Sequence, residues 1–252
     1  MAFIHNIDPA FLRIGHFELR YYGLVWVAGF LLAYYILNKY RKNGKLDISV
    51  EKLESFMLYL ILGVLIGARL FHVLFSDPSY YFSNPSRILA FWEGGVAFHG
   101  GLVGAALVVY YFVKKNNLSW KQLGDAIAVP TVLALALGRI ANFINGELWG
   151  TITNVSWCVN FPGVSGCRHP SQLYESIANF FIFGVLFFWN KKENKSGFIF
   201  WMFILLMGIT RFLISFLRED DKWLGLSDGQ YFSLIMIIIG GYVLFKHYFK
   251  YE

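Results

Sequence analysis

Apolar segments about as long as the hydrocarbon core of a bilayer recur along almost the whole chain, and they constrain its fold more than any other feature. A membrane-spanning helix needs about 20 predominantly apolar residues. Seven stretches approach or exceed that length: 21–37, 53–75, 95–113, 124–144, 173–190, 198–217 and 231–248. Because 57% of the 252 residues are hydrophobic and only 15% are charged, an ordinary soluble domain is excluded. We expect an all-α integral membrane protein with seven transmembrane helices, forming a single transmembrane domain over residues 1–252.

Basic residues alternate between the connecting segments and predict how the helices are oriented. Cytoplasmic loops of membrane proteins are enriched in Lys and Arg. The basic connections here are 38–52, 114–122 and 190–197. The connections 76–94, 145–172 and 218–230 hold few basic residues or balance them with acidic ones, so we expect outer-face loops there, with the N-terminus outside and the C-terminus cytoplasmic. The net charge of +6 is mostly this topology signal. The basic loops lack the aromatic and glycine pattern of a nucleic-acid module, so no nucleic-acid partner is expected.

Three arginines, Arg69, Arg139 and Arg211, lie inside apolar segments. At the centre of a membrane-spanning helix each would cost about 2.5–3.5 kcal/mol, or on the order of 8–10 kcal/mol together, unless the charge is compensated. The predicted orientation places all three in the outer portions of their helices, together with His99 near the start of the third helix. His99 stands in a glycine-rich run, where a ligand can approach the backbone, and helix N-termini favour anions. These four residues predict an anion site at the outer leaflet.

Each of these residues also has a plainer interpretation, which the sequence leaves open. An arginine near a helix end can extend its charged group to the lipid headgroups, and a histidine in a glycine-rich helix can serve packing alone. Arg218 lies seven residues after Arg211, about two helical turns on. One of the pair could hold a phosphate while the other guides it, or Arg218 could be a headgroup anchor.

The densest polar run extends from Gly138 to Gly150. Arg139, Asn142 and Asn145 are spaced i, i+3 and i+6 and would share one broad helical face. Such a face must line a cavity or pair its groups with one another, since hydrocarbon would leave them unsatisfied. Glu147 is the nearest carboxylate, and a purely structural Arg–Glu clamp remains open. The run from His169 to Glu175 opens the fifth helix, with Ser171 as a candidate cap and with Gln172 and Glu175 as candidates for polar contacts.

The two cysteines, Cys158 and Cys167, both fall in the connection between the fourth and fifth helices. An extracytoplasmic loop permits a disulfide, but sequence separation alone does not establish one, so a disulfide and two unpaired thiols both stay open. The cysteines do not resemble a metal site. The chain has no Gly-x-Ser-x-Gly elbow, His-Glu-x-x-His pair, Walker loop or Asp-rich magnesium motif. We therefore expect metal-free chemistry or pure binding, and no cofactor.

Five motifs together resemble those of the prolipoprotein diacylglyceryl transferase family, and the resemblance covers nearly the whole chain. They are Tyr21–Leu24, Phe98–Gly101, Gly138–Gly150, His169–Glu175 and Arg211–Arg218. The resemblance implies an enzyme of the bacterial cytoplasmic (inner) membrane that performs the first step of lipoprotein maturation. Such an enzyme transfers the diacylglyceryl group of phosphatidylglycerol to the lipobox cysteine thiol of a preprolipoprotein. A thioether forms at the outer leaflet, and glycerol phosphate is released.

The resemblance also implies roles for individual residues at matching motif positions. They are Tyr22, His99, Arg139, Asn142, Glu147, Gly150 and Arg211. We predict His99, Arg139 and Arg211 as catalytic. We predict Arg139 also as substrate-binding, together with Tyr22, Asn142, Glu147, Gly150, Arg69 and Arg218. The chain departs from the family pattern at Ser215, where the family often has an acidic residue, so Glu147 or lipid phosphate is expected to pair with Arg211.

The chemistry assigns His99 as general base toward the substrate thiol, or alternatively as a phosphate ligand. With a thiol pKa near 8.5 and an imidazole pKa near 6.5, the proton transfer is uphill by about 2.7 kcal/mol, a modest barrier. The competing class is an anionic-lipid transporter or a seven-helix receptor without chemistry. Against it, the chain shows no internal repeat and no lysine inside a helix to hold a chromophore.

Overall fold

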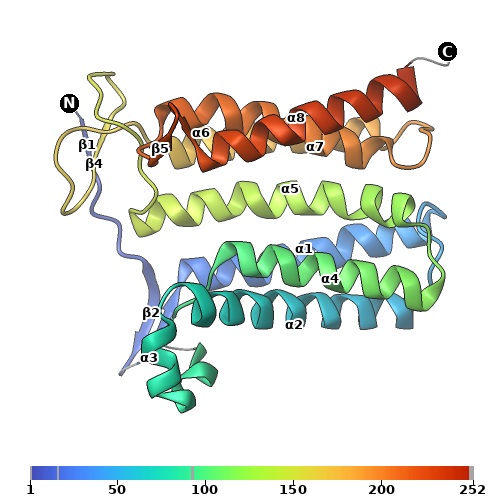
Figure 1. Ribbon diagram of the computed structural model, residues 1–252, viewed down its shortest axis with the longest axis horizontal. Helices are drawn as coiled ribbons and strands as arrows, with labels where there is room; N and C mark the ends of the chain where they lie inside the picture. The colour runs from blue at the N-terminus through green and yellow to red at the C-terminus, as the bar shows by residue number, and fades with distance from the viewer. Residues whose placement is uncertain (1, 16, 92–93, 250–252) are drawn as a thin grey trace. The chain divides into compact units, whose positions relative to one another are not determined.

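The computed structural model describes residues 2–15, 17–91 and 94–249, so residues 92–93 of the predicted outer loop 76–94 and residues 250–252 lie outside the described residues. The described part is built from seven long helices (Figure 1). They are α1 (Tyr21–Lys42), α2 (Val50–Phe75), α4 (Phe98–Asn116), α5 (Trp120–Asn145), α6 (Ser171–Trp189), α7 (Phe198–Ile214) and α8 (Asp228–Leu244). Shorter turns are α3 (Pro78–Ser83), η1 (Pro85–Leu89), η3 (Ser215–Leu217) and η4 (Phe245–Phe249).

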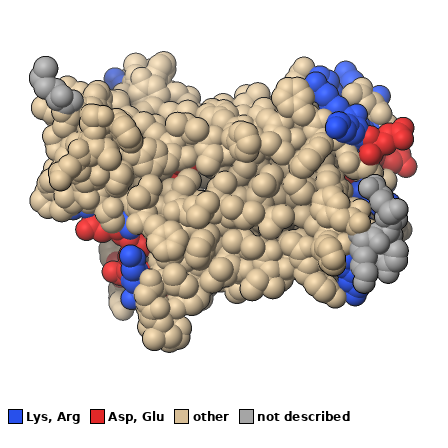
Figure 2. Space-filling model, turned by 90° about the horizontal axis from the view of Figure 1, so that it is seen from above, with Lys and Arg blue, Asp and Glu red and all other residues tan. Residues whose placement is uncertain are grey.

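Six of the helices in the described part are long and apolar enough to cross a membrane. They are α1, α2, α5, α6, α7 continued to Leu217, and α8 continued to Phe249. The exception is α4, whose 19 residues include His99, two tyrosines and two lysines, which lower its hydropathy. The prediction of a helical, multi-pass membrane protein is confirmed. Seven spans and the orientation of the termini stay predictions. On the face that Figure 2 shows, most Lys, Arg, Asp and Glu side chains lie toward the left and right of the view, and the surface between them has almost none.

The helices begin and end a few residues away from the apolar stretches because caps, not hydrophobicity, set the boundaries. Ser49 precedes α2, and its hydroxyl accepts from the Lys52 amide at 3.3 Å. Ser227 and Gln230 form a capping box at the start of α8. At the end of α4, Asn117 adopts a left-handed conformation with φ of 52°, a common stop signal.

The chain divides into two compact units, residues Met1–Ile36 with Gly124–Glu252 and residues Leu37–Leu123, and each is described by itself. In the second unit α2 packs against α4 through glycines. A Cβ on Gly67 or Gly104 would collide with the carbonyl oxygen of Gly100 or of Gly63 on the facing helix. Small residues therefore let these two backbones approach closely, as is common between membrane helices. The prediction of a single domain stays a prediction.

In the first unit α6, α7 and α8 pack together, and their shared core includes side chains from α5. Its fully buried members are Val129, Val132, Ile182 and Leu186. The Asp125 carboxylate of α5 accepts from the Gly197 and Phe200 amides, at 2.6 and 2.8 Å, and so satisfies the first turn of α7.

Short strands connect the ends of these helices. A parallel pair joins β1 (Phe3–Ile4) to β4 (Val159–Asn160). Two antiparallel hairpins join β2 (Ala10–Ile14) to β3 (Phe17–Arg20), and β5 (Lys222–Trp223) to β6 (Leu226–Ser227). The β1–β4 pair fastens the N-terminal segment to the connection between α5 and α6.

Candidate functional site

One carboxylate gathers three arginines in the first unit. The Glu175 Oε2 atom lies 2.6 Å from Arg139 Nε, and its Oε1 atom accepts from Arg218 Nη1 at 3.1 Å. Arg211 Nη1 donates to the same Oε1 atom. The Glu175 side chain is only 6% exposed. A buried carboxylate of this kind needs positive partners, and α5, α7 and the segment after η3 each supply one.

A second carboxylate, Asp220, completes what we call the Glu175 cluster: Glu175, Asp220, Arg139, Arg211 and Arg218. Asp220 accepts from Arg218 Nε at 3.1 Å and lies 3.7 Å from Arg211 Nη2. Three guanidinium groups thus share two carboxylates, which leaves a formal charge of +1. Arg139 and Arg211 keep 25% and 27% of their side chains exposed, whereas Arg218 keeps 8%. The excess charge is therefore accessible at Arg139 and Arg211.

Arg218 is the most constrained arginine of the cluster. Burial opposes its charge, but the hydrogen bond with Asp220 and the charge of Glu175 outweigh that effect and raise the pKa of the guanidinium. Its backbone is bridged to Gly150. A Cβ on Gly150 would collide with the Leu217 carbonyl oxygen and lie 2.8 Å from His169 Cβ. A glycine is required at position 150 because the chain before Arg218 passes so close to it.

The polar face of α5 pairs its groups with one another. Arg139 Nη1 donates to Asn142 Oδ1 at 3.1 Å, and Asn142 Nδ2 donates to Glu147 Oε1 at 2.7 Å. Asn145 Nδ2 donates to the same oxygen at 3.3 Å. The predicted shared face is therefore confirmed, with Glu147 holding the asparagines. The expectation that Glu147 pairs with Arg211 is wrong, since Arg211 pairs with Glu175.

The start of α6 positions Glu175 against the end of α5. Ser171 does not cap this helix as predicted, because Pro170 occupies the N-cap position and the Ser171 hydroxyl donates to the Leu148 carbonyl at 2.9 Å. Gln172 Nε2 donates to the Glu147 carbonyl at 2.6 Å. The predicted polar roles of Gln172 and Glu175 are confirmed. Both bonds hold the backbone after α5 beside the first turn of α6, one turn before Glu175.

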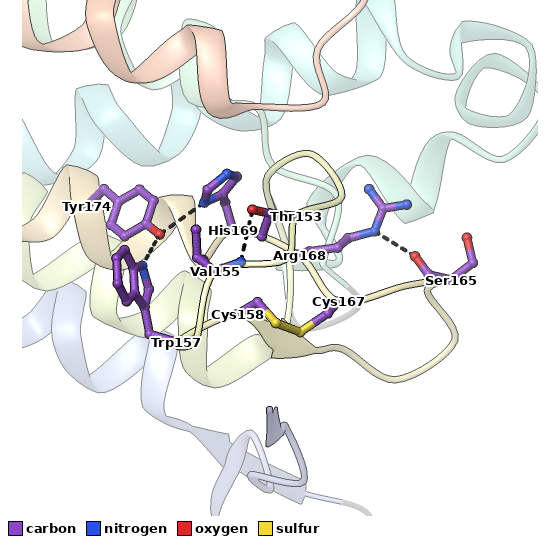
Figure 3. Close-up of a disulfide and its surroundings, with 9 residues drawn as sticks. All are labelled: Thr153, Val155, Trp157, Cys158, Ser165, Cys167, Arg168, His169 and Tyr174. Carbon is purple, nitrogen blue, oxygen red and sulfur yellow. Dashed lines mark hydrogen bonds between the residues drawn. A yellow bond between two sulfur atoms is a disulfide. The ribbon is translucent and has the colours of Figure 1, made fainter. Parts of the chain in front are cut away.

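The loop between α5 and α6 carries the disulfide between Cys158 and Cys167, whose Cα atoms are 5.5 Å apart (Figure 3). The structure thus decides between the two alternatives that the sequence leaves open. Tyr174, in the first turn of α6, contacts two side chains of this loop. Its hydroxyl accepts from Trp157 Nε1 at 2.7 Å and lies 3.1 Å from His169 Nδ1. Burial lowers the pKa of His169. The disulfide and these hydrogen bonds give the loop a defined form next to Gly150 and Arg218.

Tyr22 also belongs to the first unit. It lies in the first turn of α1, with its ring 6.1 Å from that of Trp26, and it is close enough to Arg139 to interact with it electrostatically. The first unit therefore brings together seven of the predicted site residues: Tyr22, Arg139, Asn142, Glu147, Gly150, Arg211 and Arg218.

The second unit holds His99 and Arg69. His99 is exposed in the first turn of α4, and its ring lies 6.1 Å from that of Phe71. Within the described residues the His99 ring makes no hydrogen bond. Arg69, in contrast, is only 2% exposed, and its guanidinium group points toward backbone carbonyl oxygens.

Sequence reasoning left Glu175 and Asp220 out of the predicted site. Glu175 stands in the polar run that opens α6, but nothing local links it to arginines 36 and 43 residues further on. Asp220 is one of three adjacent acidic residues, Glu219 to Asp221, and only the fold selects it. A local signal for Asp220 was its place two residues after Arg218.

The fold and the cluster define a class: a multi-pass helical membrane protein with a partly exposed, net positive arginine site. A family model described as prolipoprotein diacylglyceryl transferase matches residues 9–246. The phosphatidylglycerol–prolipoprotein diacylglyceryl transferase of Geobacter sulfurreducens is 41% identical over 247 residues, 95% of each chain. Those of Bordetella parapertussis and Nitrosomonas europaea are 42% and 40% identical, covering 93% and 96% of this chain and 93% and 91% of their own.

The chain belongs to the prolipoprotein diacylglyceryl transferase family. The prediction of a transferase of this family is confirmed, and it prevails over the transporter or receptor alternative.

Proposed function

We propose that the chain transfers the diacylglyceryl group of phosphatidylglycerol to the lipobox cysteine thiol of a preprolipoprotein. The names of its relatives contain both substrates. The observation that carries the proposal is the Glu175 cluster, which offers two partly exposed guanidinium groups and one unbalanced positive charge. A phosphodiester carries one negative charge, so this lipid headgroup would neutralise the site.

The site faces the outer leaflet of the bacterial cytoplasmic membrane, in a chain with seven spans, its N-terminus outside and its C-terminus cytoplasmic. Lys39, Arg41 and Lys42 end α1, and Lys114 and Lys115 end α4, as expected at cytoplasmic ends. The Glu175 cluster lies at helix ends that the alternation of basic loops predicts to be extracytoplasmic. Its residues come from the second half of α5, the first turns of α6 and the end of α7. We count α4 as the seventh span because it packs along α2 through their glycines.

The reaction moves charge onto the phosphate. The thiolate attacks the glyceryl carbon, a carbon–sulfur bond forms, and the carbon–oxygen bond to phosphate breaks. The leaving glycerol phosphate is a monoester with a second pKa of about 6, so it gains up to one further negative charge. Arg139 and Arg211 stabilise this charge as it develops, which is where fixed donors are most effective. Bidentate guanidinium groups suit a phosphate better than a lysine would.

The remaining residues of the site hold the two catalytic arginines in place and complete the lipid site. Asn142 and Glu147 orient Arg139 through the hydrogen bonds already described. Gly150 admits the segment before Arg218, and Arg218 shares Glu175 with Arg211. Tyr22 lies near Arg139 and contacts the headgroup. No metal and no cofactor take part.

His99 accepts the proton of the substrate thiol. Its ring is exposed in the first turn of α4, so a substrate thiol can approach it. The transfer from a thiol to imidazole is uphill by about 2.7 kcal/mol, a modest barrier. In the alternative, a protonated His99 binds the phosphate. A pH–rate profile separates the two roles, since a base acts in its neutral form and a phosphate ligand in its charged form.

The test uses purified protein in detergent with phosphatidylglycerol and a lipobox peptide. Glycerol phosphate release and peptide mass are followed for the unchanged protein, for His99→Gln and for a peptide with alanine in place of cysteine. We expect a mass gain that needs both the thiol and His99. Arg13→Lys, in the exposed ion pairs of the β2–β3 hairpin, is the control for a folded chain with one arginine replaced. Lipid binding without release would favour the transporter or receptor class.

A further inference from the structure

All five N–H groups of the Arg69 guanidinium are used inside the protein. Nε donates to the Ile88 carbonyl at 2.9 Å, and Nη2 donates to the Arg87 and Ala90 carbonyls at 2.6 and 3.2 Å. Nη1 donates to the Gly94 carbonyl and, at 2.8 Å, to the Gly95 carbonyl. A guanidinium has five such groups. None is left for a phosphate, in contrast with the arginines of the Glu175 cluster.

The charge of Arg69 is compensated without an ion pair to any described carboxylate. Its Cζ atom lies 5.0 Å from the centre of the Tyr81 ring and 5.6 Å from that of Phe91. Aromatic faces and carbonyl dipoles both attract a cation. The five acceptors belong to residues 87–90 and 94–95, so this one side chain holds both of these stretches of backbone against α2.

The fixed segment leads directly into α4. The Ala97 amide donates to the Ala68 carbonyl at 3.0 Å, one residue before Arg69. Gly95 has a positive φ of 74°, and a Cβ there would lie 2.7 Å from Arg69 Nη1 and 2.8 Å from His72 Nε2. The chain is thus attached to α2 on both sides of the turn, and α4 begins at Phe98 with His99 as its second residue.

We propose that Arg69 is a positioning residue, which sets the place of the first turn of α4 and therefore of His99, and that it does not bind the lipid phosphate. This inference rests on the proposed function in one respect, namely that His99 takes part in the transfer. Lysine is a poor substitute because its ammonium has three N–H groups on one nitrogen and cannot reach five carbonyls in a plane. The role replaces the earlier prediction that Arg69 binds substrate.

The experiment compares Arg69→Lys with Arg139→Lys in the full-length protein, measuring kcat, the KM for phosphatidylglycerol and amide hydrogen exchange over residues 87–97. A displaced His99 would lower kcat on the order of 100-fold, as misplacement of about 1 Å can, and leave the lipid KM within about twofold. Exchange over 87–97 would become faster in Arg69→Lys alone. In Arg139→Lys we expect a higher lipid KM and unchanged exchange in this segment.

Gly95→Ala is the second variant, used in particular if Arg69→Lys does not fold. It retains Arg69 but forces its guanidinium from the carbonyls, so it should reproduce the loss of kcat and the faster exchange. A raised lipid KM with unchanged exchange in Arg69→Lys would overturn the proposal and identify Arg69 as a lipid ligand. Full activity in both Arg69→Lys and Gly95→Ala would also overturn the proposal, because His99 would then not depend on Arg69. If His99→Gln proves fully active, the proposed catalytic function fails, while exchange and lipid KM still decide whether Arg69 is positional.

Discussion

Arg69 and the arginines of the Glu175 cluster all lie in or beside apolar helices, but their side chains have different partners. Arg69 is surrounded by five backbone carbonyls, and its charge is enclosed. Arg139, Arg211 and Arg218 share only two carboxylates, which leaves one positive charge unbalanced. About a quarter of the Arg139 and Arg211 side chains is exposed. On this difference we base the proposal that Arg139 and Arg211, whose partners leave charge unbalanced, act on substrate. Arg69, whose N–H groups are all satisfied by carbonyl dipoles, is proposed to be structural.

The largest expected effect follows from removing the charge of Glu175, the carboxylate that the cluster arginines share. Glu175→Gln leaves three guanidinium groups with one carboxylate, and removal of one partner from a buried ion pair costs about 3–5 kcal/mol. We expect a loss of thermal stability on that scale together with loss of turnover. Glu193→Gln, at an exposed glutamate after α6, is the matched control and should change neither. Unchanged stability in Glu175→Gln would mean that the arginines do not depend on this carboxylate.

Arg139→Lys should have the next largest effect. The ammonium keeps the charge but cannot hold Glu175, Asn142 and a phosphate in one plane. Loss of one donor to a developing anion reduces kcat by about 100-fold to 1,000-fold, and the missing lipid contact also raises the KM. Steady-state kinetics with phosphatidylglycerol measure both, with Arg13→Lys as control. Kinetics identical to those of the unchanged protein would remove Arg139 from the phosphate site.

Gly229→Ala tests how closely Arg211 is held, and we expect a smaller effect. A Cβ at position 229 would lie 3.1 Å from Arg211 Nη2 and 3.3 Å from its Nε, so the guanidinium must shift by a few tenths of an ångström. We expect kcat to fall by less than about tenfold with little change in stability, because the end of an arginine side chain can adjust. Gly241→Ala in the same helix meets only Leu205 Cδ1, at 4.0 Å, and should leave turnover unchanged. Equal activity in the two variants would show that Arg211 tolerates displacement.

Local patterns in the sequence predicted much of the fold and one part of the site. The apolar stretches correspond in order to the seven long helices of the described residues, and the spacing of Arg139, Asn142 and Asn145 predicted their common face. Both inferences depend on residues within one helix, where periodicity determines direction. The helix ends were placed less well, since Ser49 and Ser227 extend α2 and α8 beyond their apolar runs.

The partners of the arginines could not be predicted, for two physical reasons. Glu175 meets Arg211 across 36 residues, a distance at which periodicity carries no information. The acceptors of Arg69 are backbone carbonyls, which every residue possesses, so the residue types at 87–90 and 94–95 do not predict them. The pairing of β1 with β4 is likewise set by tertiary contacts.

Ser215 tests whether Arg211 needs any partner besides Glu175 and Asp220, and we expect the smallest effect here. It stands one turn after Arg211, where the family often has an acidic residue, and its hydroxyl is buried at 1% exposure without a hydrogen-bond partner in the described part of the chain. If Glu175 and Asp220 already supply the negative charge that Arg211 needs, this hydroxyl contributes nothing to the site.

Ser215→Ala should then leave turnover and lipid KM within about twofold and raise stability slightly, since an unpaired buried hydroxyl is unfavourable. Thermal unfolding and steady-state kinetics measure both quantities. A loss of turnover comparable to that of Gly229→Ala would instead mean that Ser215 takes over the task of the missing acid, and that the balance of charge around Arg211 extends beyond the two carboxylates.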